Sequence, residues 1–194
     1  FAGDPATQQN DGVSAESSRQ SILGRISYNF QEKYIIDFNA RYDGSYVFPE
    51  GKRFGFFPGV SAAWVMSEEF FKEVSGVNDL KLRASVGKMG NDRISPFQFM
   101  PGVTPNPNVT WEVATTYNLG LDGMFWNGGL SFTVEVFKQR RTNILTKRNL
   151  EVPFYTGLQL PDENIGVVEN KGLEIALNHR GKPSAPGGLS YTVG

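Results

Sequence analysis

The sequence predicts an all-β fold, an antiparallel up-and-down transmembrane β-barrel segment of about eight strands. Two observations carry this prediction. Apolar and polar side chains alternate along segments of about ten residues, so each segment has one apolar and one polar face. The connections between these segments are alternately compact and long, as in barrels whose short turns and long loops lie on opposite sides of a membrane.

The first two strands show the alternation most clearly. After a polar loop over residues 1–19, we expect strands at about 20–30 and 34–43, joined by a tight turn over 31–33. The expected apolar positions are Ile22, Gly24, Ile26, Tyr28 and Phe30 in the first strand, and Tyr34, Ile36, Phe38, Ala40 and Tyr42 in the second.

The third and fourth strands are separated by a compact connection. A stretch rich in glycine, proline and aromatic residues leads to a strand near 56–66, and the fourth strand is expected at about 79–88. Between them, Ser67 is expected to be the N-cap of a short helix, with Glu68 and Glu69 in its first turn.

The fifth and sixth strands follow a loop that is too rich in proline, over 89–109, to be a central strand. We expect the fifth strand at about 110–122, where Trp111, Val113, Thr115, Tyr117, Leu119 and Leu121 alternate with polar residues. A turn over 123–129 then leads to the sixth strand, which begins at Leu130.

The remaining strands follow a second long connection, expected over about 140–167. The seventh strand alternates Leu173, Ile175 and Leu177 with polar residues. A turn over 180–188 precedes an eighth strand that begins at Leu189 and is cut short, so both ends of the chain are expected to be internal to a larger protein.

Composition excludes several kinds of site. The 194 residues hold 19 Lys and Arg against 20 Asp and Glu, so no overall field favours nucleic acid. The absence of cysteine removes disulfides and thiolate chemistry, and the single histidine, His179, makes a His-rich metal site or a catalytic triad improbable. We therefore expect no cofactor, no metal and no enzyme activity.

Aromatic residues gather near the expected compact turns. In a barrel they would form a membrane-interface girdle, whereas in a soluble β-sandwich they would fill the core. The predicted interface residues are Tyr28, Phe30, Tyr34, Trp64, Phe125 and Trp126.

Several motifs, in order, resemble those of SusC/RagA-type TonB-dependent transporters of Bacteroidetes-like outer membranes. They cover most of residues 20–180. The motifs are YDGS at 42–45, RFGFFPGVSAAW at 53–64, LKLRASVG at 80–87 with GN at 90–91, NPNVTWE at 106–112, YNLGLD at 117–122 and VENKGLE at 168–174.

This resemblance implies a 22-stranded outer-membrane barrel with an N-terminal plug, energised through the TonB complex. It also implies contact with outer-membrane lipid and a SusD-like substrate-binding lipoprotein. The imported nutrient would be a small molecule such as an oligosaccharide or a peptide. Residues 1–194 would then be a partial barrel domain, with the plug and both ends of the barrel missing.

The candidate substrate-contacting or lumen-facing residues come from the long loops and the polar strand faces. Arg53 and its aromatic neighbours could bind a ligand or could shape the entry of a strand, and we favour the second. For the residues at 91–93 and 111–112, substrate contact and loop ordering are equally compatible with the sequence. The set is Arg41, Arg53, Asn91, Arg93, Trp111, Glu112 and Glu135.

Two other functions remain open at this stage. A soluble β-sandwich that binds carbohydrate or acts as an adhesin would show the same alternation. A TonB-dependent siderophore receptor would share the barrel. An enzyme ranks last, because the neighbouring carboxylates Glu68/Glu69 and Asp162/Glu163 do not form a convergent catalytic set.

Overall fold

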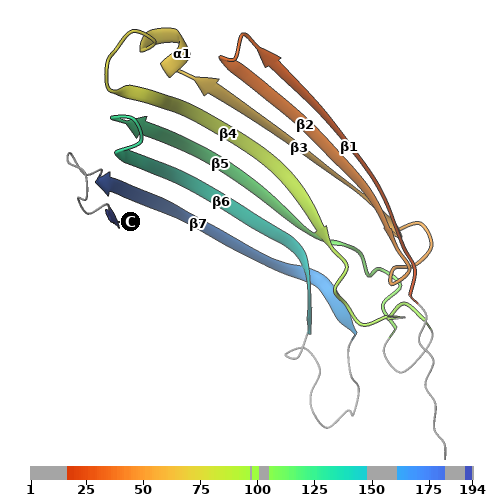
Figure 1. Ribbon diagram of the computed structural model, residues 1–194. Coiled ribbons are helices and arrows are strands. Elements are labelled where there is room, and N and C mark those ends of the chain that lie inside the picture. Colours follow the sequence, from red (N-terminus) through yellow and green to blue (C-terminus); the bar gives the residue numbers. More distant parts are fainter. Residues whose placement is uncertain (1–16, 97, 101–104, 148–160, 182–190, 194) are drawn as a thin grey trace, which may run out of the picture.

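The computed structural model describes residues 17–96, 98–100, 105–147, 161–181 and 191–193. In this part of the chain, eight strands form one antiparallel sheet whose spatial order is the order of the sequence (Figure 1). The up-and-down arrangement predicted from the sequence is therefore confirmed. The strands are β1 (Arg19–Phe30), β2 (Tyr34–Ser45), β3 (Phe54–Val65), β4 (Val77–Asn91), β5 (Glu112–Phe125), β6 (Leu130–Lys147), β7 (Asp162–Gly181) and β8 (Tyr191–Val193).

The long strands bend together into a curved wall with two different ends (Figure 1). At one end lie α1 (Ser67–Phe70) and the tight turns between β1 and β2 and between β5 and β6. Gln31, Glu32, Trp126 and Asn127 have positive φ in these turns, as tight hairpins require. We call this the turn end. The connections after β2 and β4, over 46–53 and 92–111, lie at the opposite, loop end.

One face of the sheet, which we call the apolar face, is exposed and hydrophobic. Ile26, Leu119 and Ile175 on this face are 70%, 53% and 68% exposed. The register joins such residues from strand to strand: Ala62 lies opposite Ala84, Ala84 opposite Leu119, Leu119 opposite Val136, and Val136 opposite Leu173. A soluble sandwich would cover this face with a second sheet, whereas the strands of the described ranges all belong to one sheet.

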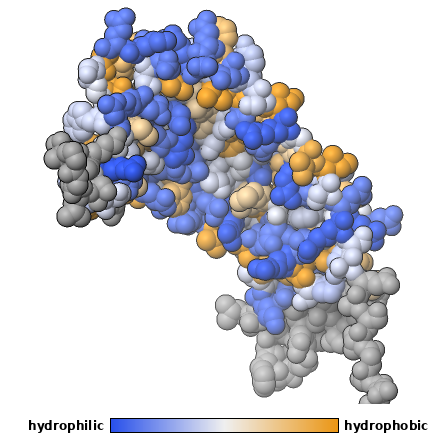
Figure 2. All heavy atoms as spheres, viewed as in Figure 1, coloured by the Kyte–Doolittle hydropathy of each residue, from blue (hydrophilic) through white to orange (hydrophobic). Residues whose placement is uncertain are grey.

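The opposite face, which we call the polar face, carries most of the charged strand residues. Asp37 lies opposite Ser61, and Glu135 lies opposite Gly120 and Glu174 on its two neighbouring strands. In the view of Figure 2, hydrophilic side chains cover much of the middle of the molecule, and hydrophobic ones gather in smaller groups.

The long connection expected over 140–167 is shorter than the sequence suggests, because the strands on both sides of it continue. β6 has 18 residues and β7 has 20, so these strands occupy much of the connection expected over 140–167. Their register shifts near Asn143, which has a φ of 59°. β4 likewise runs to Asn91. The expected start of the last strand, at Leu189, lies outside the described residues.

The helix also differs from the expectation. The N-cap of α1 is Met66, and Ser67 is the first helical residue, with its hydroxyl 3.3 Å from Oδ1 of Asp79. The helix is only four residues long. The Ser67 hydroxyl therefore links α1 to Asp79 of β4 and does not cap the helix.

Pro58 marks the point where the pairing between β3 and β4 stops. That ladder begins at Gly59, opposite Gly87, so residues 54–58 pair with β2 alone. Proline has no N–H to donate, and in a central strand it is tolerated where pairing is interrupted. The interruption leaves room at the loop end for a buried hydrophobic cluster, which we call the loop-end cluster. Its members are Val47, Phe48, Phe57, Val109 and Trp111.

Candidate functional site

On the polar face, the guanidinium of Arg83 binds carboxylates of two neighbouring strands. Its Nε donates to Oδ2 of Asp122 at 2.9 Å, and its Nη2 donates to Oε2 of Glu135 at 2.5 Å. The hydroxyl of Thr133 donates to the other carboxylate oxygen of Asp122 at 2.9 Å. The arrangement joins β4, β5 and β6 through side chains as well as through the backbone. We call these four residues the Arg83 network.

Gly120 makes this arrangement sterically possible. It lies between Arg83 and Glu135 in the register, and a Cβ placed on it would be 2.7 Å from Cζ of Arg83. No real side chain sits so close to its neighbours, so a residue larger than glycine would push the guanidinium away from Glu135. The glycine is required here for space rather than for an unusual backbone conformation.

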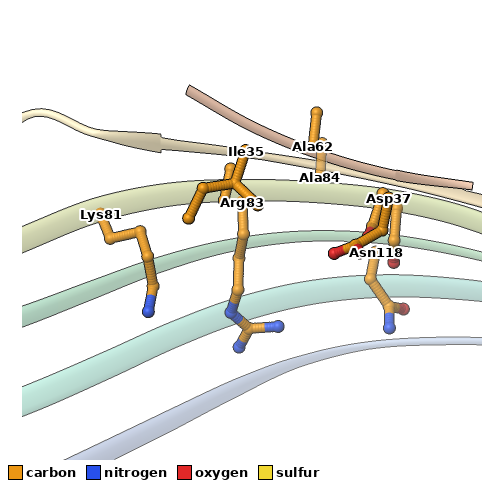
Figure 3. A pocket seen from close by; sticks show the side chains of 10 residues that line it. Ile35, Asp37, Ala62, Lys81, Arg83, Ala84 and Asn118 are labelled. Atoms are coloured by element: carbon orange, nitrogen blue, oxygen red, sulfur yellow. The ribbon is translucent and has the colours of Figure 1, made fainter. Parts of the chain in front are cut away.

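A cavity of about 330 Å³ lies beside the Arg83 network on β2 to β5. In Figure 3, Lys81, Arg83 and Asn118 point to the same side of the sheet, away from Ala62. Oδ1 of Asn118 is buried and has no hydrogen-bond partner among the described residues. The cavity is lined by Ile35, Asp37, Ser61, Ala62, Ala63, Lys81, Arg83, Ala84, Ser85 and Asn118.

The loop-end cluster is a packed aromatic core. The ring of Trp111 lies 4.8 Å from Phe48 and 5.3 Å from Phe57, both as centroid distances. Phe57 covers two glycines, since a Cβ on Gly55 or Gly90 would overlap its ring. Aromatic pairs at such distances favour one another by about 0.5–1.5 kcal/mol beyond burial. This cluster packs Val47 and Phe48 of the 46–53 connection, and Val109 and Trp111 of the 92–111 connection, against the wall.

Polar contacts attach the 92–111 connection to both sides of the sheet. Asp92 accepts hydrogen bonds from Arg19 of β1 and Ser45 of β2, both at 2.7 Å. At the other end of the connection, the amide of Asn164 in β7 binds the backbone N–H of Thr110 at 3.0 Å and its carbonyl at 3.0 Å. The first residue of the connection thus contacts β1 and β2, and Thr110 near its end contacts β7.

Most of the candidate residues predicted from the sequence lie at the loop end. Arg41 pairs with Asp43 at 2.9 Å, and the Nε of Arg53 donates to the carbonyl of Phe48 at 3.3 Å. Trp111 is 7% exposed and belongs to the loop-end cluster; it precedes β5, although the sequence places it inside a strand. For Arg53 and Trp111, the contacts found are those of loop ordering.

Asn91, Arg93 and Glu112 lie close together where β4 ends and β5 begins. The amide of Asn91 donates to Glu112 at 3.3 Å, and its Oδ1 accepts from the backbone N–H of Arg93 at 3.1 Å. Glu112 is also 3.7 Å from Arg141. Glu135 is not part of this group, because it lies in the Arg83 network. The candidate set thus divides between the loop end and the middle of the polar face.

The predicted interface aromatics lie at the turn end, most of them in stacked pairs. Tyr34 and Trp64 are 6.4 Å apart, Tyr28 and Phe30 are 6.5 Å apart, and Phe125 and Trp126 are 6.2 Å apart. Their contact with lipid remains a prediction.

Glu69 of α1 is held by two of these aromatic side chains. The Tyr34 hydroxyl donates to Oε2 of Glu69 at 2.8 Å, and Trp64 Nε1 donates to the same oxygen at 2.7 Å. These bonds favour the ionised form, so the Tyr34 hydroxyl first and then the Trp64 indole lower the pKa of Glu69 below its usual value.

Sequence reasoning missed Asp122, Thr133 and Gly120 as parts of a site. The alternation places Asp122 on the same face as Asn118, at the end of the expected strand. It does not predict which residues of the neighbouring strands lie beside Asp122. No group of three or more His, Asp and Glu in the described ranges could hold a metal ion. In the same ranges, no helix is long and apolar enough to cross a membrane.

Comparison with known proteins identifies relatives of the whole segment. The family model described as "TonB dependent receptor-like, beta-barrel" matches residues 2–194. Two TonB-dependent receptors of Formosa agariphila are each 32% identical, over 178 and 198 residues. Their alignments cover 81% and 92% of this chain but only 18% and 20% of the relatives. The chain thus spans about a fifth of their length.

A third curated relative is the TonB-dependent receptor SusC of Bacteroides thetaiotaomicron, 29% identical over 199 residues, with 90% of this chain and 20% of the relative covered. Among solved structures, the RagAB peptide transporter matches with a TM-score of 0.79 and 25% identity, over 88% of this chain and 20% of that chain. The open-open state of the RagAB peptide importer matches in fold, with a TM-score of 0.79 and 24% identity over 91% of this chain and 22% of that chain.

Proposed function

Because the chain belongs to the TonB-dependent receptor-like β-barrel family, we propose that it forms part of the wall of a TonB-dependent nutrient transporter in an outer membrane. The observation that supports this most strongly is the two-faced sheet. Its apolar face carries exposed residues such as Ile26 and Ile175 on strands at both sides of the wall. In water such a surface would cause aggregation, whereas in lipid it is stabilising.

The dimensions of the apolar face agree with a membrane span. From Tyr34 to Tyr42, β2 rises about 26 Å, and a tilt of about 40° reduces this to roughly 20 Å. The apolar band of an outer-membrane barrel is about 25 Å high. Tyr34 stacks with Trp64 at one limit, and Tyr42 stacks with Phe54 at the other, with centroids 5.2 Å apart. Paired aromatic residues at both limits are typical of interface girdles.

The polar face then lines the lumen. The Arg83 network would keep three neighbouring strands rigid while a plug moves beside them. Lys81 and Asn118 would be available to a plug or a passing solute, since Lys81 makes no ion pair among the described residues and Oδ1 of Asn118 lacks a hydrogen-bond partner there. The plug, the TonB-contacting segment and the remaining strands would lie elsewhere in the longer protein.

The loop end would face the cell exterior and a substrate-binding lipoprotein of the SusD type. The loop-end cluster and the contacts of Asp92 and Asn164 hold the two ends of the 92–111 connection in place. A rigid surface costs less entropy to bind than a flexible one. Candidate cargoes are oligosaccharides and peptides. We favour peptides as the first class to test, because a structural relative at 25% identity is a peptide transporter.

The experiment is a deletion and complementation of the full-length gene that contains this segment. The full-length product should fractionate with the outer membrane, co-purify with a lipoprotein, and restore uptake of labelled oligopeptides or oligosaccharides only when TonB is present. Uptake that does not depend on TonB, or a product recovered only from the soluble fraction, would contradict the proposal.

A further inference from the structure

A group of basic side chains lies on the apolar face of β4, β6 and β7, on the loop-end side of Val86, Val136 and Leu173. On β7 the exposed Val167 follows further along the same face. Alternation along β6 places Lys138 and Arg140 on the same face as Val136, which is 52% exposed. The same alternation places Lys88 beyond Val86 in β4 and Lys171 next to Leu173 in β7. All four basic residues are exposed. We call Lys88, Lys138, Arg140 and Lys171 the basic rim.

The register brings the basic rim together. Lys138 lies directly opposite Lys171 on the neighbouring strand, and Arg140 lies opposite Glu169. Lys88 lies opposite Thr115, which in turn lies opposite Arg140. Strands are about 4.8 Å apart, so Lys88 and Arg140 start roughly 10 Å apart across the small threonine. Long side chains from both positions can reach one ligand.

Acidic side chains of the described residues balance the basic rim only in part. Glu169 is its one acidic neighbour in this register, and it is 3.1 Å from Lys138. The chain as a whole is nearly neutral, with a formal net charge of −1, so this local excess of positive charge is not a general property. Like charges directly opposite on neighbouring strands are destabilising unless something neutralises them. An external anion would remove that cost.

The position of the basic rim along the strands places it near lipid head groups. Lys138 and Arg140 lie two and four residues beyond Val136, which is about 7 and 13 Å along the strand. Allowing for strand tilt, they stand roughly 5–10 Å beyond Val136, the last exposed hydrophobic residue of β6, at the height where lipid head groups begin. They face outward, away from the lumen and therefore away from the transport path.

Resting on the proposed outer-membrane location, the geometry points to the basic rim as a binding site for phosphate-bearing head groups of lipids in the outer leaflet. Arg140 and Lys171, which make no ion pair among the described residues, contact the phosphate most directly. Lys138 shares its charge between Glu169 and the lipid. Lys88 extends the site across β5.

The test uses the full-length transporter purified in mild detergent and native mass spectrometry to count bound lipids. The probes are a phosphorylated lipid A, its dephosphorylated form and inorganic phosphate. Each basic residue near a membrane surface contributes roughly fivefold to anionic-lipid affinity. The variant Arg140→Gln/Lys171→Gln is therefore expected to bind phosphorylated lipid A about 25-fold more weakly, and binding to the unmodified protein should weaken as salt is raised.

The control variant is Lys81→Gln/Arg141→Gln, which removes two positive charges from the polar face and should retain lipid binding. Arg141 is adjacent to Arg140 in sequence and differs in the face it occupies. If the test variant does not assemble, two other measurements replace it. Arg140→Lys/Lys171→Arg keeps both charges, so it should assemble and keep its affinity for phosphorylated lipid A. Binding of that lipid to the unmodified protein should weaken as salt is raised. Equal binding of phosphorylated and dephosphorylated lipid, equal loss in the control, or competition by millimolar phosphate would overturn the inference.

These outcomes are separate from a failure of the proposed function. A product that does not reach the outer membrane would contradict the transporter assignment. A product that reaches the membrane and transports its cargo, but shows no preference for phosphorylated lipid, would contradict the lipid site alone.

Discussion

At the scale of single residues, the Arg83 network depends on contacts between strands. Arg83 of β4 and Glu135 of β6 lie on the polar face, and the register puts Gly120 of β5 between them. The register depends on backbone pairing along whole strands, which no single residue encodes. A change at any one of these positions should therefore affect the contacts of all three strands.

Arg83→Gln tests the network directly. The change leaves Asp122 and Glu135 without their common cation in a site where the side chain of Glu135 is 20% exposed. We expect a loss of about 1–3 kcal/mol in unfolding free energy for the full-length barrel. The measurement is the midpoint temperature, at which half of the protein, heated before electrophoresis, migrates as the unfolded form on a gel. Lys81→Gln, two residues away on the same face and without an ion pair among the described residues, should change the midpoint little; equal shifts would argue against the network.

Gly120→Val tests the space above the glycine. The new side chain would occupy the path of the Arg83 guanidinium, so we expect destabilisation comparable to that of Arg83→Gln. The double variant Arg83→Gln/Gly120→Val should be less destabilised than the sum of the two single variants, because both remove the same contact. Full additivity would show that Gly120 is needed for a different reason.

Glu69 gives a pH-dependent prediction at the turn end. Because its pKa in the folded protein is lowered by the Tyr34 and Trp64 hydrogen bonds, its stabilising effect is present above the unfolded pKa of about 4.5 and is lost as pH falls through the lowered folded value. Hydrogen exchange of residues 64–71 should therefore be faster in Glu69→Gln than in the unmodified protein at pH 7. The difference should disappear in strong acid. A Glu68→Gln control should show a smaller effect at pH 7, since among the described residues Glu68 pairs with Lys72 alone, at 3.4 Å.

At the scale of elements, strand centres were predicted well and strand ends were not. The apolar face ends on β6 at Val136, and beyond it Lys138 and Arg140 make both faces of the strand polar. Hydrophobic alternation therefore disappears while backbone pairing with β7 continues to Lys147. The N-cap of α1 differs from the expectation because the Ser67 hydroxyl contacts Asp79 of β4, a contact between elements that the local sequence does not predict.

Phe57→Ala tests the loop-end cluster as an element. The ring fills the space where β3 and β4 do not pair, so its removal should leave a cavity and cost about 3–5 kcal/mol. We expect limited proteolysis to cleave the 92–111 connection of the full-length protein much faster, while the barrel remains inserted. Phe56→Ala is the matched control, because Phe56 is 58% exposed on the apolar face. Equal cleavage of both variants would contradict the assigned role of the cluster.

At the scale of the whole molecule, the sequence was sufficient to predict one curved sheet with unlike faces, and the comparisons identify the family. The sheet has exposed hydrophobic residues on one face and the Arg83 network on the other. The described strands leave the long edge of β1 without a partner strand. Such an edge is unfavourable in lipid, which agrees with a segment that is completed by further strands of a longer protein.

If the apolar face contacts lipid and the polar face lines a lumen, neighbouring residues of β2 should differ in what they contact. The chain contains no cysteine, so single cysteines can be introduced at Ile36, Asp37, Phe38 and Asn39 of the full-length protein, after replacing any cysteine outside this segment. Spin labels at these positions report contact with lipid-soluble oxygen or with a water-soluble nickel chelate. We expect oxygen contact at 36 and 38, and lower oxygen contact with greater access to the chelate at 37 and 39. Absence of this two-residue period, or the opposite phase, would contradict this arrangement of the two faces.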